Sequence, residues 1–214
     1  MEEQIVTGSS ELLPQSSGLG GSSDDSCFLD PDEVSIPSIS VPVSPFNRGC
    51  QRLSILHELK LRCSRLRVRF GLRSKFRDHA GRPRLNFVVD VAPNICQVLE
   101  ACDDAALKQS VASGSDSEWR PVVVRENGYV RLNLPTPVNG EMAMSDEEIY
   151  RQDSYSSGAI QKLTLNASGD GETELGTLLV PGTTVDAYVC LELYDYKKNA
   201  GIKLVVKKLI IHCT

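Results

Sequence analysis

The feature that most constrains this chain is a stretch of alternating residues, SRLRVRFGLRSKFRD, at positions 64–78. Arginine and lysine occupy its odd positions, interrupted only by Gly71, and apolar residues occupy most of its even positions. Because successive side chains of a strand point to opposite faces, the pattern predicts a long β-strand with one basic and one apolar face. Such a strand needs a sheet or barrel to bury its apolar face.

Charge is segregated along the chain, although the formal net charge is only −5. Residues 1–47 contain eight acids and no Lys or Arg, and residues 48–84 contain twelve bases and two acids. More than half of the 23 bases therefore lie within 37 residues. This concentration indicates a site for a polyanion or for an acidic protein.

Three regions are predicted from composition. Residues 1–47 are rich in Ser, Pro and Gly, so we expect a disordered acidic tail. Residues 48–63 are expected to be a basic linker or a short helix, because Leu53, Leu56 and Leu59 have helical spacing. Residues 64–214 are expected to be the folded domain, and a chain of this length buries about two-thirds of its unfolded surface.

The folded part is predicted to contain about eight strands and one substantial helix, a pattern that favours an antiparallel barrel or sandwich. After the basic strand we expect a strand at 85–92, a helix at 95–112, a hairpin around Glu126-Asn127-Gly128, a polar connection at 136–158, and strands in AIQKLTLNA, ETELGTLLV, VDAYVCLELYDY and IKLVVKKLIIH. In VDAYVCLELYDY the apolar residues share one face and three tyrosines share the other.

The order of these features resembles the OB-fold single-stranded-DNA-binding proteins of phages and large DNA viruses. The resemblance covers residues 60–212 and rests on the basic strand pair, the helix, a hairpin led by Trp119, and a last hairpin from Gly182 to Ile211 with aromatic residues before a Lys turn. It implies a mainly β fold, an OB-like antiparallel β-barrel with one inserted helix. It also implies a viral protein that binds single-stranded DNA in replication or recombination.

A basic strand face with nearby aromatic rings suits a single strand, whose phosphates need cations and whose unstacked bases need flat surfaces. The predicted nucleic-acid-binding residues are Arg65, Arg67, Arg69, Arg73, Lys75, Arg77, Arg82, Arg84, Trp119, Tyr129, Tyr188, Tyr194, Tyr196, Lys197 and Lys198. About six phosphate contacts would give a slope of log K against log salt of about −4. Binding is expected to be independent of sequence, and RNA stays open beside DNA.

The acidic tail has three interpretations. It competes with nucleic acid for the basic face, it recruits a replication protein such as a polymerase or helicase, or it only keeps the chain soluble. A homo-oligomer also stays open. Two other classes of protein fit the pattern: a viral jelly-roll structural protein, and a protein-binding β-domain whose arginines dock an acidic partner. Large assemblies would mark the first class, and no nucleic-acid binding at low salt would mark the second.

Motifs for catalysis or cofactor binding are not found in the sequence. No G-x-x-x-x-G-K-[ST], G-x-G-x-x-G, G-x-S-x-G or H-E-x-x-H occurs, and the seven cysteines form no C-x-x-C pair. We therefore expect no enzyme, no metal and no cofactor. The N-terminus has no signal-peptide pattern and no apolar run approaches the length of a membrane span, so a cytoplasmic or nuclear protein with reduced thiols is expected.

Overall fold

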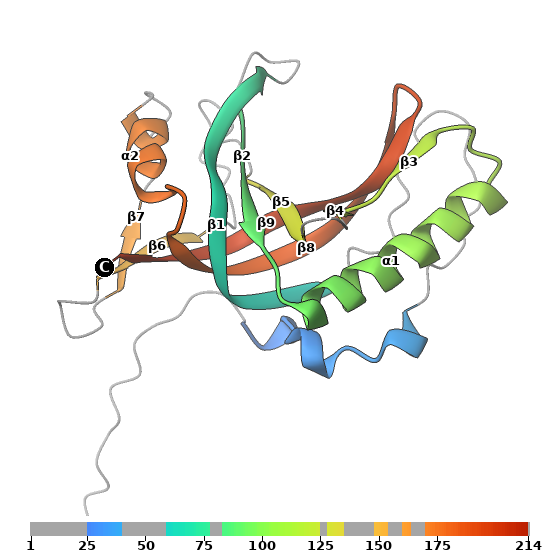
Figure 1. Ribbon diagram of the computed structural model, residues 1–214, viewed down its shortest axis with the longest axis horizontal. Coiled ribbons are helices and arrows are strands. Elements are labelled where there is room, and N and C mark those ends of the chain that lie inside the picture. The colour runs from blue at the N-terminus through green and yellow to red at the C-terminus, as the bar shows by residue number, and fades with distance from the viewer. Residues whose placement is uncertain are drawn as a thin grey trace, which may run out of the picture.

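The computed structural model describes residues 25–39, 59–77, 83–124, 128–134, 148–153, 160–163 and 170–213. The strands are β1 (Lys60–Arg77), β2 (Pro83–Asp90), β3 (Glu118–Arg120), β4 (Val123–Val124), β5 (Tyr129–Asn133), β6 (Glu148–Asp153), β7 (Ile160–Leu163), β8 (Thr184–Tyr196) and β9 (Asn199–Cys213). The helices are α1 (Pro93–Ala112) and α2 (Asp170–Leu178), preceded by the short 3-10 helices η1 (Asp25–Cys27), η2 (Pro31–Glu33) and η3 (Ile36–Ser38). Figure 1 shows α1 and β3 on one side of the barrel, and α2, β6 and β7 on the other.

Five strands close a barrel. Strand β1 pairs antiparallel with β2 and with β8, and β2 pairs antiparallel with β5. Strand β9 completes the circuit, because it pairs parallel with β5 and antiparallel with β8. The order β1–β2–β5–β9–β8–β1 is that of the five-stranded OB barrel, with α1 inserted between β2 and β5. The predicted OB-like β-barrel is therefore confirmed by the strand pairing.

Alternate residues of these strands fill the barrel. The predicted apolar face of β8 lies inside, with Val185, Ala187 and Leu191 fully buried. Phe87 from β2 is also fully buried, and α1 packs Leu99 and neighbouring apolar residues against the same core. The helix predicted at 95–112 forms over 93–112, because one of its faces can be buried on the barrel while the other stays in water.

Strand β1 is bent, and its alternation changes phase. Leu61 and Cys63 face the core, but further along Leu66 does so, which shifts the buried set from odd to even positions. The change occurs at Arg65, where φ is +58° and the pairing with β8 is shifted. Further shifts against β2 leave Phe70 42% exposed. The single straight basic face predicted from the sequence is therefore wrong, because bulges in a curved barrel strand redirect successive side chains.

Two predicted elements take another form. ETELGTLLV, predicted as a strand, falls largely in α2, where Leu175 and Leu179, four residues apart, are fully buried. The polar connection predicted at 136–158 contains β6, which pairs parallel with the end of β9. In β6 Ile149 is the one apolar residue that is buried, so no alternation revealed this strand.

Residues 25–39 are folded against the barrel, so the prediction of a disordered tail is wrong for this part; residues 1–24 and 40–58 lie outside the described residues. The N–H of Leu29 donates to the carbonyl of Lys60 over 2.9 Å, and its carbonyl accepts from the N–H of Arg62 over the same distance. These bonds extend the edge of β1 and order the segment.

Apolar contacts support this docking. Pro31 is buried, and Val34 and Ile39 pack against the core of the barrel. Because the segment adds to an existing core, it needs little apolar surface of its own. Strand β1 already begins at Lys60, so the predicted linker or helix is also wrong at its C-terminal end. None of the helices in the described part of the chain has the length and apolar character needed to cross a membrane.

Candidate nucleic-acid interface

A groove of about 830 Å³ lies on the outer surface of the barrel, where β2 and β5 meet the end of the β8–β9 hairpin. We call it the barrel groove. Its charged lining consists of Arg84, Arg120, Arg131, Lys197 and Lys203. Three tyrosines also line it: Tyr129, Tyr194 and Tyr196. Among the residues that the structure describes, no Asp or Glu lines the groove.

Strand pairing explains why these side chains share one surface. Val88 on β2 pairs with Arg131 on β5, while the neighbouring pair, Phe87 and Leu132, points into the core. Because residues alternate between the two faces, Tyr129 and Arg131 lie on the same outer face. Val88 is only 6% exposed and forms the apolar floor between the basic residues.

The positive charge of the groove is only partly neutralised. Arg84 and Arg131 form no ion pair with another described residue. Arg120 is held in place by two bonds, from Nη2 to Glu118 Oε2 over 2.8 Å and from Nε to Asn199 Oδ1 over 3.0 Å. Its remaining N–H groups stay available to an anion, because a guanidinium has five donors.

An aromatic cluster adjoins the groove at Tyr129. The ring centroids of Phe70 and Tyr129 are 6.3 Å apart in an edge-to-face arrangement. The guanidinium carbon of Arg69 lies 5.0 Å from the Tyr129 ring centroid, and that of Arg73 lies 5.6 Å from the Phe70 centroid. Asp90 fixes Arg69 through a 3.0 Å ion pair. The exposed Phe70 ring thus forms a stacking surface flanked by two guanidinium groups.

The turn between β8 and β9 is strained. Tyr196 pairs with Asn199, which leaves Lys197 and Lys198 as a two-residue loop. Their φ angles are +49° and +61°, the left-handed region that hairpin turns of type I′ require and that lysine adopts at a cost. The Nζ of Lys197 lies 5.2 Å from the ring centroid of Tyr196, which is 56% exposed. Strained backbone of this kind is concentrated at binding sites.

Burial raises the pKa of the Tyr194 hydroxyl, and the charge of Asp103 acts in the same direction against the opposing effect of nearby arginines. The hydroxyl therefore stays protonated at neutral pH. Tyr194 can donate a hydrogen bond from its position in the groove.

The structure brings together about half of the predicted binding residues. Those at the groove or its adjoining cluster are Arg69, Arg73, Arg84, Tyr129, Tyr194, Tyr196 and Lys197. The side chains of Lys75 and Arg77, and all of Arg82, lie outside the described residues.

Three predicted residues are placed elsewhere by their contacts. Trp119 is packed against the core, and its indole N–H donates to Asp103 over 3.2 Å. Tyr188 is only 6% exposed and lies under Phe28, about 20 Å along β8 from Tyr194 at about 3.3 Å per residue. Lys198 forms a 3.1 Å ion pair with Asp116. Of the three tyrosines predicted to share the polar face of β8, Tyr194 and Tyr196 line the groove and Tyr188 does not.

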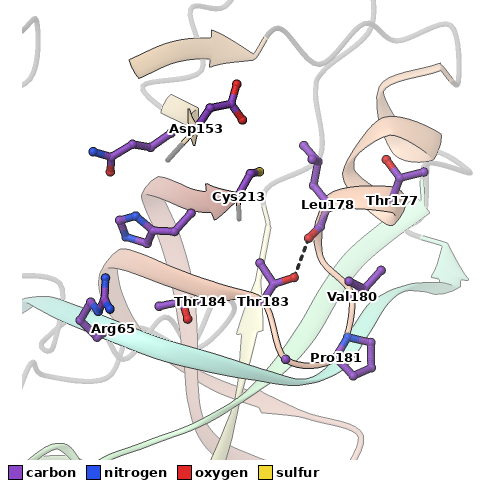
Figure 2. A pocket seen from close by; sticks show the side chains of 12 residues that line it. Arg65, Asp153, Thr177, Leu178, Val180, Pro181, Thr183, Thr184 and Cys213 are labelled. Carbon is purple, nitrogen blue, oxygen red and sulfur yellow. Dashed lines mark hydrogen bonds between the residues drawn. The ribbon is translucent and has the colours of Figure 1, made fainter. Parts of the chain in front are cut away.

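Arg65 and Arg67 are not among the residues that line the groove. Arg67 is exposed and pairs with Thr184 of β8. Arg65 lines a second pocket of about 760 Å³, where it and Asp153 project from different elements (Figure 2). The lining combines these opposite charges with Cys213 and several threonines, so this pocket has no net preference for a polyanion.

Sequence reasoning missed Phe70, Arg120, Arg131 and Lys203. Arg131 could have been found, because it follows Tyr129 by two residues in a strand and must share its face. Phe70 could not, since the regular alternation assigned it to the core. Within the described residues no group of three or more His, Cys, Asp and Glu side chains is arranged to hold a metal ion.

The closed barrel and the groove across β2 and β5 define an OB-like protein with a basic and aromatic surface. No protein-family model matches the chain. By sequence it is similar to Protein NEN1 of Arabidopsis thaliana, 44% identical over 221 residues that cover 99% of this chain and 45% of NEN1. It is also similar to Protein NEN2 of the same plant, 41% identical over 202 residues that cover 90% of this chain and 41% of NEN2. The chain spans less than half the length of these relatives.

Among solved structures, the chain is similar to gp2.5, a single-stranded DNA binding protein encoded by bacteriophage T7. The TM-score is 0.42 and the identity 11%, over 71% of this chain and 90% of gp2.5. It is also similar to a truncated single-stranded DNA-binding protein from bacteriophage Enc34, with a TM-score of 0.40 and 7% identity, over 72% of this chain and 86% of that one. The expected phage or viral origin is not supported, because the sequence relatives are plant proteins.

The prediction that the protein is not an enzyme is overturned by the similarity to the NEN proteins, because the motif search behind that prediction covers less than half of the length of these relatives. The missing catalytic motifs concern only these 214 residues. They say nothing of the part of the relatives that this chain does not span.

Proposed function

We propose that this chain is a single-stranded nucleic-acid-binding domain that holds the strand in the barrel groove. The observation that supports this best is the composition of the groove, five basic residues and three tyrosines, beside the exposed Phe70. Basic residues contact phosphates and aromatic rings stack on bases, and together they bind a single strand without reading its sequence. DNA is the first candidate, and RNA has the same two features.

A single strand suits this surface better than a duplex. Tyr196 is 56% exposed and Phe70 is 42% exposed, so both rings can receive a base. In a duplex the base faces are hidden in the stack, and these rings would gain nothing from binding. Base–aromatic stacking contributes about 1–3 kcal/mol per base, enough to separate the two substrates by tenfold or more.

For a protein of the length of the NEN relatives, we infer that the barrel holds a single strand for an activity in another part of the polypeptide. We further propose that the domain acts in single-strand processing, including replication or recombination, in the cytoplasm or nucleus. The acidic residues that precede the barrel would then lie close to any basic replication protein that joins it.

Fluorescence anisotropy with labelled single-stranded and duplex oligonucleotides of equal length, across a salt series, tests the proposal. The chain is expected to bind the single strand more tightly. If the five basic residues of the groove each contact a phosphate, log K falls against log salt with a slope of about −3.5. The double variant Arg84→Ala, Arg131→Ala removes two contacts, so the slope weakens by about 1.4 and affinity at 0.1 M salt falls by about 25-fold.

Lys108→Ala is the matched control, because Lys108 is an exposed base on α1 outside the groove. Its effect on slope and affinity should be small. No binding of either oligonucleotide at low salt would overturn the proposal and favour a domain that docks an acidic protein. An equal loss for Lys108→Ala and the double variant would show that general charge, not the groove, binds the strand.

A further inference from the structure

A row of paired side chains crosses the sheet at a distance from the barrel groove. Strand pairing sets Arg62 of β1 opposite Tyr188 of β8, and Tyr188 opposite Lys208 of β9. Lys208 in turn pairs with the start of β6, and Tyr150 of β6 pairs with Lys162 of β7. Directly paired residues project from the same face of a sheet. We call Arg62, Tyr188, Lys208, Tyr150 and Lys162 the cation–aromatic row.

The cations of this row lie over its rings. The Nζ of Lys208 is 5.0 Å from the ring centroid of Tyr188 and 5.7 Å from that of Tyr150. The guanidinium carbon of Arg62 is 6.0 Å from Tyr188, and the Nζ of Lys162 is 5.9 Å from Tyr150. Glu148, which is paired with Lys208 between β6 and β9, forms an ion pair with Lys162 over 3.2 Å. Arg62 is exposed, so the row offers a cation that can face an anion next to a ring that can face a base.

Residues 25–28 cover this row. The carboxylate of Asp25 forms an ion pair with the ammonium of Lys208, which is 18% exposed. The ring of Phe28 stands edge-on to Tyr188, with centroids 5.2 Å apart and an interplanar angle of 85°. An acidic group on the lysine and an aromatic ring on the tyrosine are the two features that a nucleotide would supply.

The cover is separable from the rest of the docked segment. The backbone bonds to β1 begin at Leu29, and the first buried residue of the segment is Pro31. Helix η1, by contrast, contains no buried residue. Residues 25–28 also contact Lys60 of β1, whose Nζ donates to Cys27 Sγ over 3.4 Å and lies 5.6 Å from the Phe28 ring centroid. Leaving the row costs these contacts too, but not the backbone bonds and buried residues that hold residues 29–39.

We propose that the cation–aromatic row is a second surface for single-stranded nucleic acid, and that Asp25 and Phe28 occupy it until a strand displaces them. A phosphate replaces the carboxylate at Lys208, and a base replaces the ring at Tyr188. The proposal rests on the proposed function for the nature of the ligand, but it concerns other residues. Since the row lies about 20 Å from the groove along β8, one strand of sufficient length reaches both.

The test uses the full chain with Arg84→Ala and Arg131→Ala, so that groove binding is weakened. Adding Asp25→Asn with Phe28→Ala should raise the affinity for a single-stranded oligonucleotide about tenfold, the equivalent of one stacked base. Adding Arg62→Gln and Lys208→Gln should then abolish the gain. Asp32→Asn is the charge-matched control, because Asp32 lies in the same segment and bonds to Asn94, away from the row.

A gain from the Asp25 and Phe28 changes that the two glutamine substitutions reverse supports the row as a binding surface. Absence of any gain, in variants whose melting temperatures show that they are folded, overturns it. An equal gain from Asp32→Asn also overturns it, since lost negative charge alone then explains the effect. If the unmodified chain binds no oligonucleotide, the proposed function fails instead, and the two failures are distinct.

Discussion

Replacing Lys197 by Asn and Lys198 by Gly should make the barrel more stable and its binding of nucleic acid weaker. Both lysines have positive φ, +49° and +61°, in the tight turn between β8 and β9. Asn-Gly is the sequence that type I′ turns prefer, because these residues adopt the left-handed region at little cost. The natural turn gives up that stability while placing Lys197 in the groove.

The magnitudes follow from the geometry. Left-handed backbone costs a residue with a side chain about 1–2 kcal/mol. Gly avoids this cost, but it loses about 0.5–1 kcal/mol because its unfolded chain has more conformational freedom. The two substitutions together should therefore stabilise the fold by about 1–2 kcal/mol. For a chain of this size that corresponds to a melting temperature higher by about 2–8 °C. Lys197 lines the groove, whereas Lys198 is ion-paired with Asp116, so the double substitution removes one phosphate contact. Losing one contact should lower the affinity about fivefold at 0.1 M salt.

Differential scanning fluorimetry and anisotropy titration measure the two effects on the same preparations. Lys197→Gln with Lys198→Gln is the matched control, because it removes both charges and keeps both side chains in the turn. This control should weaken binding without raising the melting temperature. An unchanged or lower melting temperature for the Asn-Gly variant would refute the strain argument, and unchanged affinity in both variants would show that the turn does not contact the strand.

Three further predictions concern the scaffold. Gly201→Ala would place a Cβ 2.5 Å from the carbonyl oxygen of Arg120, so overpacking should lower the free energy of unfolding by about 1–3 kcal/mol, as measured by chemical denaturation. Gly176→Ala is the control, because no atom lies within 4 Å of its added Cβ, and it should not destabilise the fold. Asp103→Ala removes the acceptor of the Trp119 indole N–H and of the Val122 N–H, and each lost bond should destabilise the fold by about 1–3 kcal/mol. Asp103→Asn keeps an acceptor and should cost less. Emission of the single tryptophan measures the difference in unfolding free energy. Burial, with a contribution from Asp30, raises the pKa of the Cys63 thiol from 9.0 to about 12. The folded state therefore keeps the thiol proton at a pH where the unfolded chain loses it. The stability contributed by the protonated thiol is complete below pH 9 and is lost as pH rises toward 12. Cys63→Val should therefore reduce the fall in urea midpoint between pH 9 and 10.5, and an identical fall in both proteins would contradict the assignment.

The barrel strands could be predicted where one face is buried and the other is wet. In β8 the buried residues Val185 and Leu191 alternate with polar ones, and this difference is large enough to be visible in the sequence. Helix α1 was predictable for the same reason, with a period of 3.6 instead of two. Each of these elements contacts the core on one face only, so the spacing of its apolar residues identifies the buried face.

The elements that were missed have patterns that fit more than one structure. Leu175 and Leu179 in α2 are spaced for a helix, but with Thr177 between them they also alternate like a strand. Strand β6 depends on a parallel partner about 60 residues away, and the docked segment 25–39 depends on a surface that exists only once the barrel has formed. Neither of these long-range contacts can be inferred from the local sequence of the segment.

The residue types of the candidate site could be predicted from the sequence, but not which of these residues line the groove. Tyr129 and Tyr194 meet in the groove because the barrel closes, although 65 positions separate them in the sequence. Tyr188 has the same residue type and strand face as Tyr194, yet another segment covers it. Which aromatic residues remain exposed is decided by long-range packing, and alternation alone does not report it.

Strand β9 pairs with four other strands, β3, β5, β6 and β8, and it follows all of them in the sequence. During synthesis the β1–β2 hairpin can form early, but the barrel cannot close until β9 has left the ribosome. The apolar faces of the earlier strands stay exposed for most of translation, a state that favours aggregation and slow folding. Protease resistance of ribosome-bound chains should therefore appear in one late step, when residues up to about 213 have emerged, and not gradually as each strand is added.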